Sequence, residues 1–183
     1  MQNLNNYKLP KKWLTKSNLI KRAIWRIIGL PILSSSIPGT GWRKLLLRIF
    51  GAKIGRGGRI KPNVKITYPW KIEIGNYCWI GEEVWIDSLE FVKIGNNVCL
   101  SQRAFICTGN HDYKSSNFDL ISRGIIIDDG CWIGACSVLS PGTKMGKNSV
   151  AAIYSLIKGE IQENSIYMGN PAIFIKERKL KSD

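Results

Sequence analysis

The stretch IDDGCWIGACSVLSPGTKMGKNSVAAIYSLI, residues 127–157, decides the fold, because an apolar residue returns at every sixth position. Glycine, asparagine and aspartate, which favour tight turns, fill the positions between these residues. A period of six fits neither an α-helix, with 3.6 residues per turn, nor a plain strand, with a period of two. It is typical of a very short strand followed by a turn, repeated three times per coil of a parallel β-helix.

The same register extends towards the N-terminus, with two slips of two residues and one long interruption after residue 106. Fifteen positions share it, and every one is apolar: Ile54, Ile60, Ile66, Ile74, Ile80, Ile86, Ile94, Leu100, Ile106, Ile127, Ile133, Leu139, Met145, Ala151 and Ile157. Many of them are followed four residues later by a second small or apolar side chain, as a narrow core requires. The sequence therefore predicts an all-β solenoid of about five coils.

Three parts of the chain follow from this register. We expect a basic, amphipathic, helical cap over residues 1–52, the β-helix over 53–162 with an excursion loop at 111–125, and a short C-terminal tail at 163–183. The segment KWLTKSNLIKRAIWRIIGL, residues 12–30, is expected to be helical until Gly29–Pro31. It has two interpretations: a cap that clasps an oligomer, or a surface that docks on an anionic membrane.

The composition narrows the possible partners and sites. A net charge of +14 indicates a polyanionic partner, but no nucleic-acid recognition motif is present, so we expect none of that class. The N-terminal residues lack the layout of a signal peptide, and the five cysteines form no CxxC pair, so we expect a cytoplasmic protein. If the N-terminal segment docks on a membrane, we expect the protein at the inner face of that membrane. A single histidine cannot complete a Cys/His metal cluster, so no metal site is expected.

Several motifs carry a family resemblance. IGNYCWIGEEVWI (74–86), the stretch quoted above and GNPA (169–172) resemble the left-handed parallel β-helix acyltransferases of the hexapeptide-repeat superfamily. LLRIFGAKIG (46–55), CTGNHDY (107–113) and FDLISRGIII (118–127) resemble, more narrowly, the colanic-acid-type acetyltransferases of bacterial exopolysaccharide clusters. The resemblance implies a left-handed β-helix, a homotrimer with active sites between neighbouring prisms, acetyl-CoA as co-substrate and a saccharide acceptor, for example a lipid-linked one.

The one histidine, His111, stands where the register is interrupted. Counted from Ile106 it is the sixth residue of its hexad, so we expect it to project outward from the prism wall. The resemblance implies that it is the general base, because a neutral imidazole can take a proton from a sugar hydroxyl near pH 7. Its other ring nitrogen needs an acceptor, for which Asp112, Asp119 and a backbone carbonyl are the alternatives.

Matching the family motifs also implies where the two substrates bind. Trp132 would flank the pantetheine arm of coenzyme A, and the backbone at Ala135 and Ile153 would bond its amides. The Ala135 amide would also stabilise the oxyanion. The basic residues expected near the nucleotide phosphates are Lys158, Lys176 and Arg178, and the polar residues expected near the acceptor are Asp87, Ser88 and Gln102.

These observations favour O-acetylation of a saccharide in surface or exopolysaccharide biosynthesis, with His111 as general base. An N-acetyltransferase acting on a nucleotide-linked amino-sugar is one alternative. A non-catalytic β-helix scaffold is the other, but it would need neither His111 nor the excursion loop. A γ-type carbonic anhydrase of similar fold needs three zinc-binding histidines, which this sequence does not have.

Overall fold

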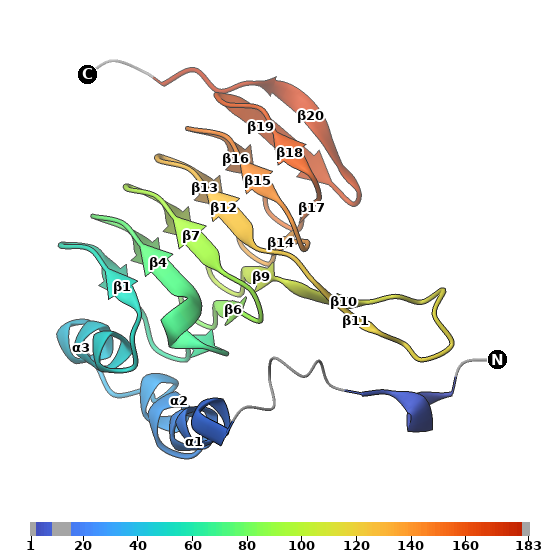
Figure 1. The fold of residues 1–183 in the computed structure, drawn as a ribbon. Helices are drawn as coiled ribbons and strands as arrows, with labels where there is room; N and C mark the ends of the chain where they lie inside the picture. The colour runs from blue at the N-terminus through green and yellow to red at the C-terminus, as the bar shows by residue number, and fades with distance from the viewer. Residues whose placement is uncertain (1–2, 9–15, 181–183) are drawn as a thin grey trace.

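The computed structural model describes residues 3–8 and 16–180, and it forms a three-sided prism of stacked coils (Figure 1). Each coil contributes one short strand to each of three parallel sheets. Sheet A consists of β1 (Lys53–Ile54), β4 (Ile72–Ile74), β7 (Val92–Ile94), β12 (Ile125–Ile127), β15 (Lys144–Met145) and β18 (Glu160–Ile161). Sheet B consists of β2 (Arg59–Ile60), β5 (Trp79–Ile80), β8 (Cys99–Leu100), β13 (Trp132–Ile133), β16 (Val150–Ala151), β19 (Ser165–Gly169) and β20 (Ala172–Glu177). Sheet C consists of β3 (Lys65–Ile66), β6 (Trp85–Asp87), β9 (Phe105–Cys107), β14 (Val138–Leu139) and β17 (Leu156–Ile157). The prediction of a left-handed parallel β-helix is confirmed, with five full coils and the start of a sixth.

The predicted register describes the core. Fourteen of its fifteen anchors are buried, and Ile54, in the terminal coil, is partly buried against them. The small residues four positions later are buried too, and the hydroxyls among them are hydrogen-bonded, as Ser137 Oγ is to the Ala152 carbonyl at 2.6 Å. A buried hydroxyl with a partner avoids the cost of an unmade hydrogen bond.

Tight turns form the three corners of the prism, named here A–B, B–C and C–A for the sheets that they join. At the A–B corner, side chains form a ladder from coil to coil. Asn76 Oδ1 accepts from the Arg56 amide at 2.9 Å, Asn96 Oδ1 from the Asn76 amide at 2.8 Å, and Asp129 Oδ1 from the Asn96 amide at 2.6 Å. The ladder satisfies backbone amides that a turn leaves without partners.

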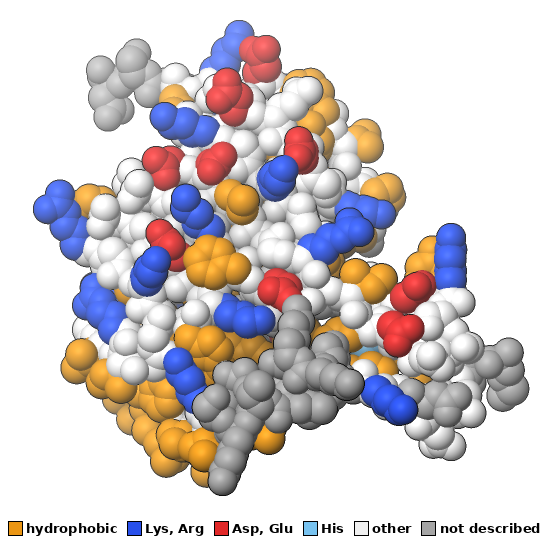
Figure 2. Space-filling model, viewed as in Figure 1, with side chains coloured by type: hydrophobic (Ala, Val, Ile, Leu, Met, Phe, Trp, Pro, Cys, Tyr) orange, Lys and Arg blue, Asp and Glu red, His pale blue; other side chains and the backbone are white. Residues whose placement is uncertain are grey.

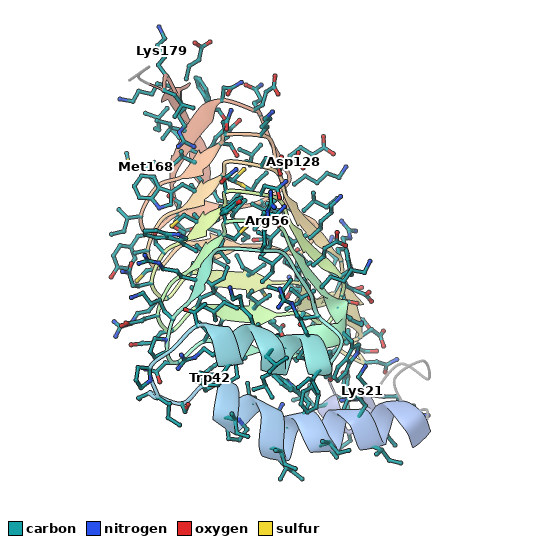
Figure 3. All side chains as sticks on the ribbon, turned by 90° about the vertical axis from the view of Figure 1, so that its left-hand side faces the viewer. Lys21, Trp42, Arg56, Asp128, Met168 and Lys179 are labelled. Atoms are coloured by element: carbon teal, nitrogen blue, oxygen red, sulfur yellow. The ribbon has the colours of Figure 1, made fainter. Side chains whose placement is uncertain are left out.

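A layer of helices closes the end of the prism at the first coil (Figure 3, where Lys21 and Trp42 mark it). It consists of α1 (Lys16–Ile24), the π-helical η3 (Trp25–Gly29), α2 (Leu30–Leu33) and α3 (Gly41–Ile49). Helical backbone thus continues past the expected stop at Gly29–Pro31: the π-helical turn leads directly into α2, with Pro31 in its first turn. Residues 12–15 of the predicted helical segment lie outside the described residues. Short 3₁₀ turns occur at η1 (Leu4–Asn6) and η4 (Pro69–Lys71).

Two buried side chains fix this layer on the prism. Trp25 is buried and its indole N–H donates to the carbonyl of Ile66, in β3, at 2.9 Å. The Arg43 guanidinium is also buried, and it donates to backbone carbonyls of the 33–39 segment, including Ser35 at 2.7 Å and Ile37 at 2.6 Å. Burial lowers the pKa of Arg43. A single cation therefore organises the connection between α2 and α3.

The segment predicted as a tail, 163–183, contains two strands. β19 pairs in parallel with β16 and carries sheet B into a sixth coil, and β20 folds back antiparallel along β19. The expected boundary at residue 162 thus falls between β18 and β19.

Candidate active site

A β-hairpin leaves the prism at the C–A corner, directly after β9, and projects away from it (Figure 1). Its strands are β10 (Gly109–His111) and β11 (Leu120–Ser122), with His111 opposite Leu120. The expected excursion loop over 111–125 is therefore a hairpin that begins at Gly109. Its place in the hexad had suggested that His111 projects from the prism wall. It lies on the hairpin instead, because the chain leaves the wall before the hexad ends.

The His111 ring contacts Phe118 and Tyr7. It stacks on the Phe118 ring with 4.0 Å between centroids, and Tyr7 meets it edge-on at 5.7 Å. Its Nδ1 lies 2.8 Å from the Phe118 carbonyl oxygen. A carbonyl can only accept, so Nδ1 carries the proton in this contact and Nε2 keeps its lone pair. The arrangement presents a basic nitrogen at Nε2.

The two carboxylates proposed to orient the ring have other partners. Asp112 Oδ1 accepts from the Lys114 amide at 2.9 Å, and Asp119 Oδ2 accepts from the Ser115 hydroxyl at 2.7 Å. Both side chains thus shape the tip of the hairpin. The orienting contact belongs to the backbone carbonyl of Phe118, the third alternative that the sequence left open.

The N-terminal segment contributes to the hairpin, which the sequence did not indicate. The Asn3 amide donates to the Ser116 carbonyl at 3.0 Å, and Tyr7 lies beside the histidine ring. No periodicity marks residues 3–8, so their contact with a hairpin a hundred residues away in sequence could not be read from any pattern.

A groove of about 420 Å³ runs over sheet B and the B–C corner. Trp79, Gln102 and Trp132 line it together with the cations Arg59 and Lys61. The indole N–H of Trp132 donates to the Ser101 hydroxyl at 2.8 Å, which holds its ring against the groove. The structure thus brings the predicted residues Trp132 and Gln102 together, at a different corner from the one that His111 leaves.

Two backbone N–H groups are available at the same corner. Ala135 and Ile153 are the second residues of successive stacked turns, and neither amide has a hydrogen-bond partner within residues 3–8 and 16–180. The Ile153 side chain is exposed beside them. Such amides can donate to a ligand or to a developing oxyanion without any rearrangement.

The three predicted phosphate ligands lie apart from one another. Lys158 is exposed at the C–A corner and Lys176 is exposed on β20. Arg178 differs from the prediction, because its guanidinium donates to the carbonyls of Gly130 at 2.8 Å and Asn148 at 3.1 Å, at the A–B corner. Arg178 therefore ties the C-terminal strand to the prism.

Of the predicted acceptor residues at the C–A corner, only Asp87 is accessible. It is half-buried, accepts from the Thr67 hydroxyl at 2.9 Å, and lies at the base of the hairpin, where Thr108 donates to its backbone carbonyl. Burial raises the pKa of the Asp87 carboxyl. Ser88 is fully buried, and its hydroxyl bridges the amide and carbonyl of Tyr68, so it has a structural role in place of the predicted one.

Comparison with known proteins identifies the family. No family model matches the chain. The colanic acid biosynthesis acetyltransferase WcaF of Escherichia coli is 37% identical over 179 residues, which cover 97% of this chain and 98% of that protein. The chain belongs to the colanic-acid-type acetyltransferases. The predicted family, and with it the prediction of an enzyme over a non-catalytic scaffold, is confirmed.

More distant relatives of this colanic-acid-type acetyltransferase agree with the assignment. The galactoside O-acetyltransferase of E. coli is 29% identical over 138 residues, covering 74% of this chain and 68% of that protein. The solved structure of the hexapeptide-repeat acetyltransferase VCA0836 of Vibrio cholerae, complexed with acetyl coenzyme A, has a TM-score of 0.84 at 20% identity, with 96% of each chain covered. That likeness shows the fold.

Proposed function

We propose that this protein transfers the acetyl group of acetyl-CoA to a hydroxyl of a saccharide in surface or exopolysaccharide assembly, with His111 as general base. The observation that carries the proposal is the 2.8 Å contact of His111 Nδ1 with the Phe118 carbonyl, which leaves Nε2 as a proton acceptor on a projecting hairpin. The names of two relatives support the reaction type: galactoside O-acetyltransferase and a lipopolysaccharide biosynthesis O-acetyl transferase, 30% identical over 110 residues.

The chemistry follows from these groups. Nε2 of His111 takes the proton of the acceptor hydroxyl as its oxygen attacks the thioester carbonyl. An amide N–H, for which Ala135 is the candidate, stabilises the negative charge on that carbonyl oxygen. The C–S bond then breaks, the C–O bond remains, and the proton held by the imidazole passes to the departing thiolate. No protein nucleophile is required.

Residues of sheet B, the B–C corner and the last coils fit coenzyme A. Trp132 offers an oriented apolar face for the pantetheine arm, the unpartnered amides of Ala135 and Ile153 can donate to its carbonyls, and Lys158 and Lys176 are the exposed cations towards the last coils. Arg178 is left out of this set because of its two carbonyl contacts.

The placement of these groups supports a composite site. His111 is carried by the C–A corner and the amide donors by the B–C corner of the same prism. We therefore propose a homotrimer in which the hairpin of one copy reaches the groove of its neighbour. The half-exposed Trp79 and Trp132, which line this groove, are surfaces that such packing would cover.

Mutation of the base tests the function. We expect His111→Ala to lower kcat ~10²–10⁴-fold, the usual contribution of general acid–base catalysis. Tyr113→Ala is the matched control, because Tyr113 is 80% exposed on the same hairpin. Acceptors bearing hydroxyls and amino groups should be assayed together, since hydroxylamine cleaves an O-acetyl ester but not an N-acetyl amide. Near-normal turnover of His111→Ala would refute the assignment, and a hydroxylamine-stable product would favour N-acetylation.

A complementation assay tests the composite site. His111→Ala and Ala135→Pro chains, each with strongly reduced turnover, should recover turnover when they are unfolded and refolded as a mixture, because some sites then combine an intact hairpin with an intact corner. A monomer by sedimentation, or mixed chains without recovered activity, would contradict the trimer.

We propose further that the helical end of the prism docks on an anionic membrane, where a lipid-linked acceptor is reached from the cytoplasm. Figure 2 shows hydrophobic side chains gathered at this end, with Lys and Arg beside them. Ile20, Ile24, Ile27 and Ile28 are all exposed. None of the helices in the described part of the chain is long and apolar enough to cross a bilayer. An exposed apolar row with flanking cations is typical of interfacial binding.

Vesicle pelleting tests the docking. The protein should bind vesicles that contain phosphatidylserine and be released by salt. Ile27 is 74% exposed, and Ile27→Asp should weaken vesicle binding. Leu180, just after β20, is 65% exposed, and Leu180→Asp should leave vesicle binding unchanged. Equal pelleting of both variants would contradict the proposal, and a change of oligomeric state in Ile27→Asp would assign the apolar row to a neighbouring copy instead.

A further inference from the structure

A basic cavity lies between the N-terminal helical layer and sheet C. It measures about 640 Å³, and its lining includes Arg22, Arg26, Lys65, Tyr68 and Trp85. None of the residues assigned above to acetyl transfer lines it. The sequence singled out this region only as a basic amphipathic segment.

The cavity lies where the positive charge of the chain is concentrated. Residues 1–72 hold 16 Lys and Arg and no Asp or Glu, whereas residues 73–183 hold 11 Lys and Arg and 13 Asp and Glu. The net charge of +14 therefore arises from the N-terminal part, and the rest of the prism is close to neutral. Charge confined in this way to a hollow attracts anions more strongly than the same charge spread over a surface.

Opposing carboxylates near the cavity are few. The Arg22 guanidinium lies 5.3 Å from the centre of the Tyr68 ring, and among the described residues no ion pair holds Arg26 or Lys65. The carboxylate that reaches Tyr68 electrostatically is Asp87.

Glu83, which reaches Lys65 electrostatically, is itself paired with Arg103 at 2.8 Å. Arg22, Arg26 and Lys65 thus line a cavity whose lining, within the described part of the chain, contains no Asp or Glu.

We infer that this cavity binds the phosphate or diphosphate of a carrier to which the acceptor saccharide is attached. A diphosphate diester carries two negative charges, and the described residues that line the cavity present cations and no carboxylate to it. Guanidinium groups bind phosphate oxygens through paired N–H donors, and the half-exposed Trp85 ring offers an apolar surface for the adjoining sugar. The inference rests on the proposed function, because it names the class of its acceptor as a phosphate-linked saccharide.

The position of the cavity suits such an acceptor. Its prism wall is formed by β3 and β6, and the hairpin that carries His111 leaves after β9, the next strand of sheet C. Neighbouring strands lie about 4.8 Å apart, so the phosphate site is one to two strand spacings, roughly 5–10 Å, from the base of the hairpin. Trp85 stacks on Phe105 with 4.7 Å between centroids, and the two rings form a continuous aromatic surface over this interval. One or two sugar units would bridge it.

Calorimetry with inorganic pyrophosphate tests the site directly. Saturating coenzyme A is included so that pyrophosphate cannot bind at the site that the diphosphate of coenzyme A occupies. We expect Arg22→Gln and Arg26→Gln each to weaken pyrophosphate binding about tenfold, the loss of one charge-assisted contact. Arg56→Gln removes the same charge from an exposed position at the A–B corner and should leave binding unchanged.

The outcomes separate this inference from the proposed function. Equal losses in Arg26→Gln and Arg56→Gln, or no pyrophosphate binding while acetyl transfer is intact, would overturn the cavity and leave the enzyme assignment standing. Pyrophosphate binding that depends on Arg26, in a protein without acetyl-transfer activity, would support the cavity and defeat the function. Binding of uridine diphosphate and of farnesyl diphosphate to the same variants distinguishes a nucleotide carrier from a lipid carrier. A preference for either compound that is lost in Arg26→Gln supports the site.

Discussion

The Ala135 amide can be removed without disturbing the turn that holds it. Residues 134–137 form a tight turn in which the Ser137 amide donates to the Gly134 carbonyl at 3.3 Å and Cys136 has a φ of 58°. A positive φ at the third position is the mark of a type II turn, whose second position favours proline. Ala135 holds that second position, and its amide has no partner in the described chain. The substitution Ala135→Pro therefore deletes one N–H donor and nothing else of the fold.

The expected effect is large on the rate and small on the fold. Loss of one oxyanion donor costs ~10²–10³ in kcat, about 2.7–4 kcal/mol of transition-state stabilisation. Proline at a compatible position leaves the free energy of unfolding equal to that of the wild type or raises it by about 0.4–1 kcal/mol. The assay is acetyl-CoA turnover with an acceptor found by screening, together with a thermal melt.

A matched control exists one corner away. Residues 146–149 form the same turn at the A–B corner, with Ser149 donating to Gly146 at 3.1 Å and Asn148 at a φ of 57°. Lys147→Pro should therefore leave both turnover and melting temperature unchanged. If Ala135→Pro retains full kcat, the oxyanion donor is elsewhere. If both variants lose activity, the loss comes from the turn and the reasoning fails.

Three further predictions concern stability and the thiols. Ile127→Ala should lower the free energy of unfolding by about 2–5 kcal/mol in chemical denaturation, whereas Ile126→Ala, 39% exposed on the same strand, should change it little. Arg43→Gln should lower the melting temperature markedly, because the buried guanidinium and its hydrogen bonds to several backbone carbonyls are lost; an unchanged melt would refute this role of Arg43. Burial raises the pKa of Cys78 and Cys131, so at pH 8 both thiols should resist a thiol reagent until the protein unfolds, and rapid labelling of the native protein would contradict their burial.

The core of this protein could be predicted because it obeys one steric rule. The interior is too narrow for two large side chains per strand, so one large apolar residue is required at every sixth position. The residues at these positions are buried from Ile60 to Ile157. The resemblance of the motifs supplied the family.

What the sequence did not indicate depends on contacts between distant segments. The Phe118 carbonyl beside His111 is a backbone group, invisible to any residue pattern. Arg178 is basic and close to GNPA, but β20 folds back and places its guanidinium on carbonyls at the A–B corner. Ser88 follows Asp87, the last residue of β6, but its side chain is buried because its hydroxyl bonds the backbone of Tyr68 in the coil before it.

The reversed direction of β20 sets the length of the solenoid. A parallel coil ends in a row of unsatisfied backbone groups, and a second molecule could continue such a row indefinitely, as in a fibre. In sheet B that row is occupied by β20, which runs antiparallel to β19, so an incoming first coil would meet an edge of the wrong polarity. At the opposite end the helical layer covers the first coil. The molecule therefore carries a terminator at each end of a fold whose repeat has no intrinsic limit, and its discrete size is a property of these two ends, independent of the hexad register itself.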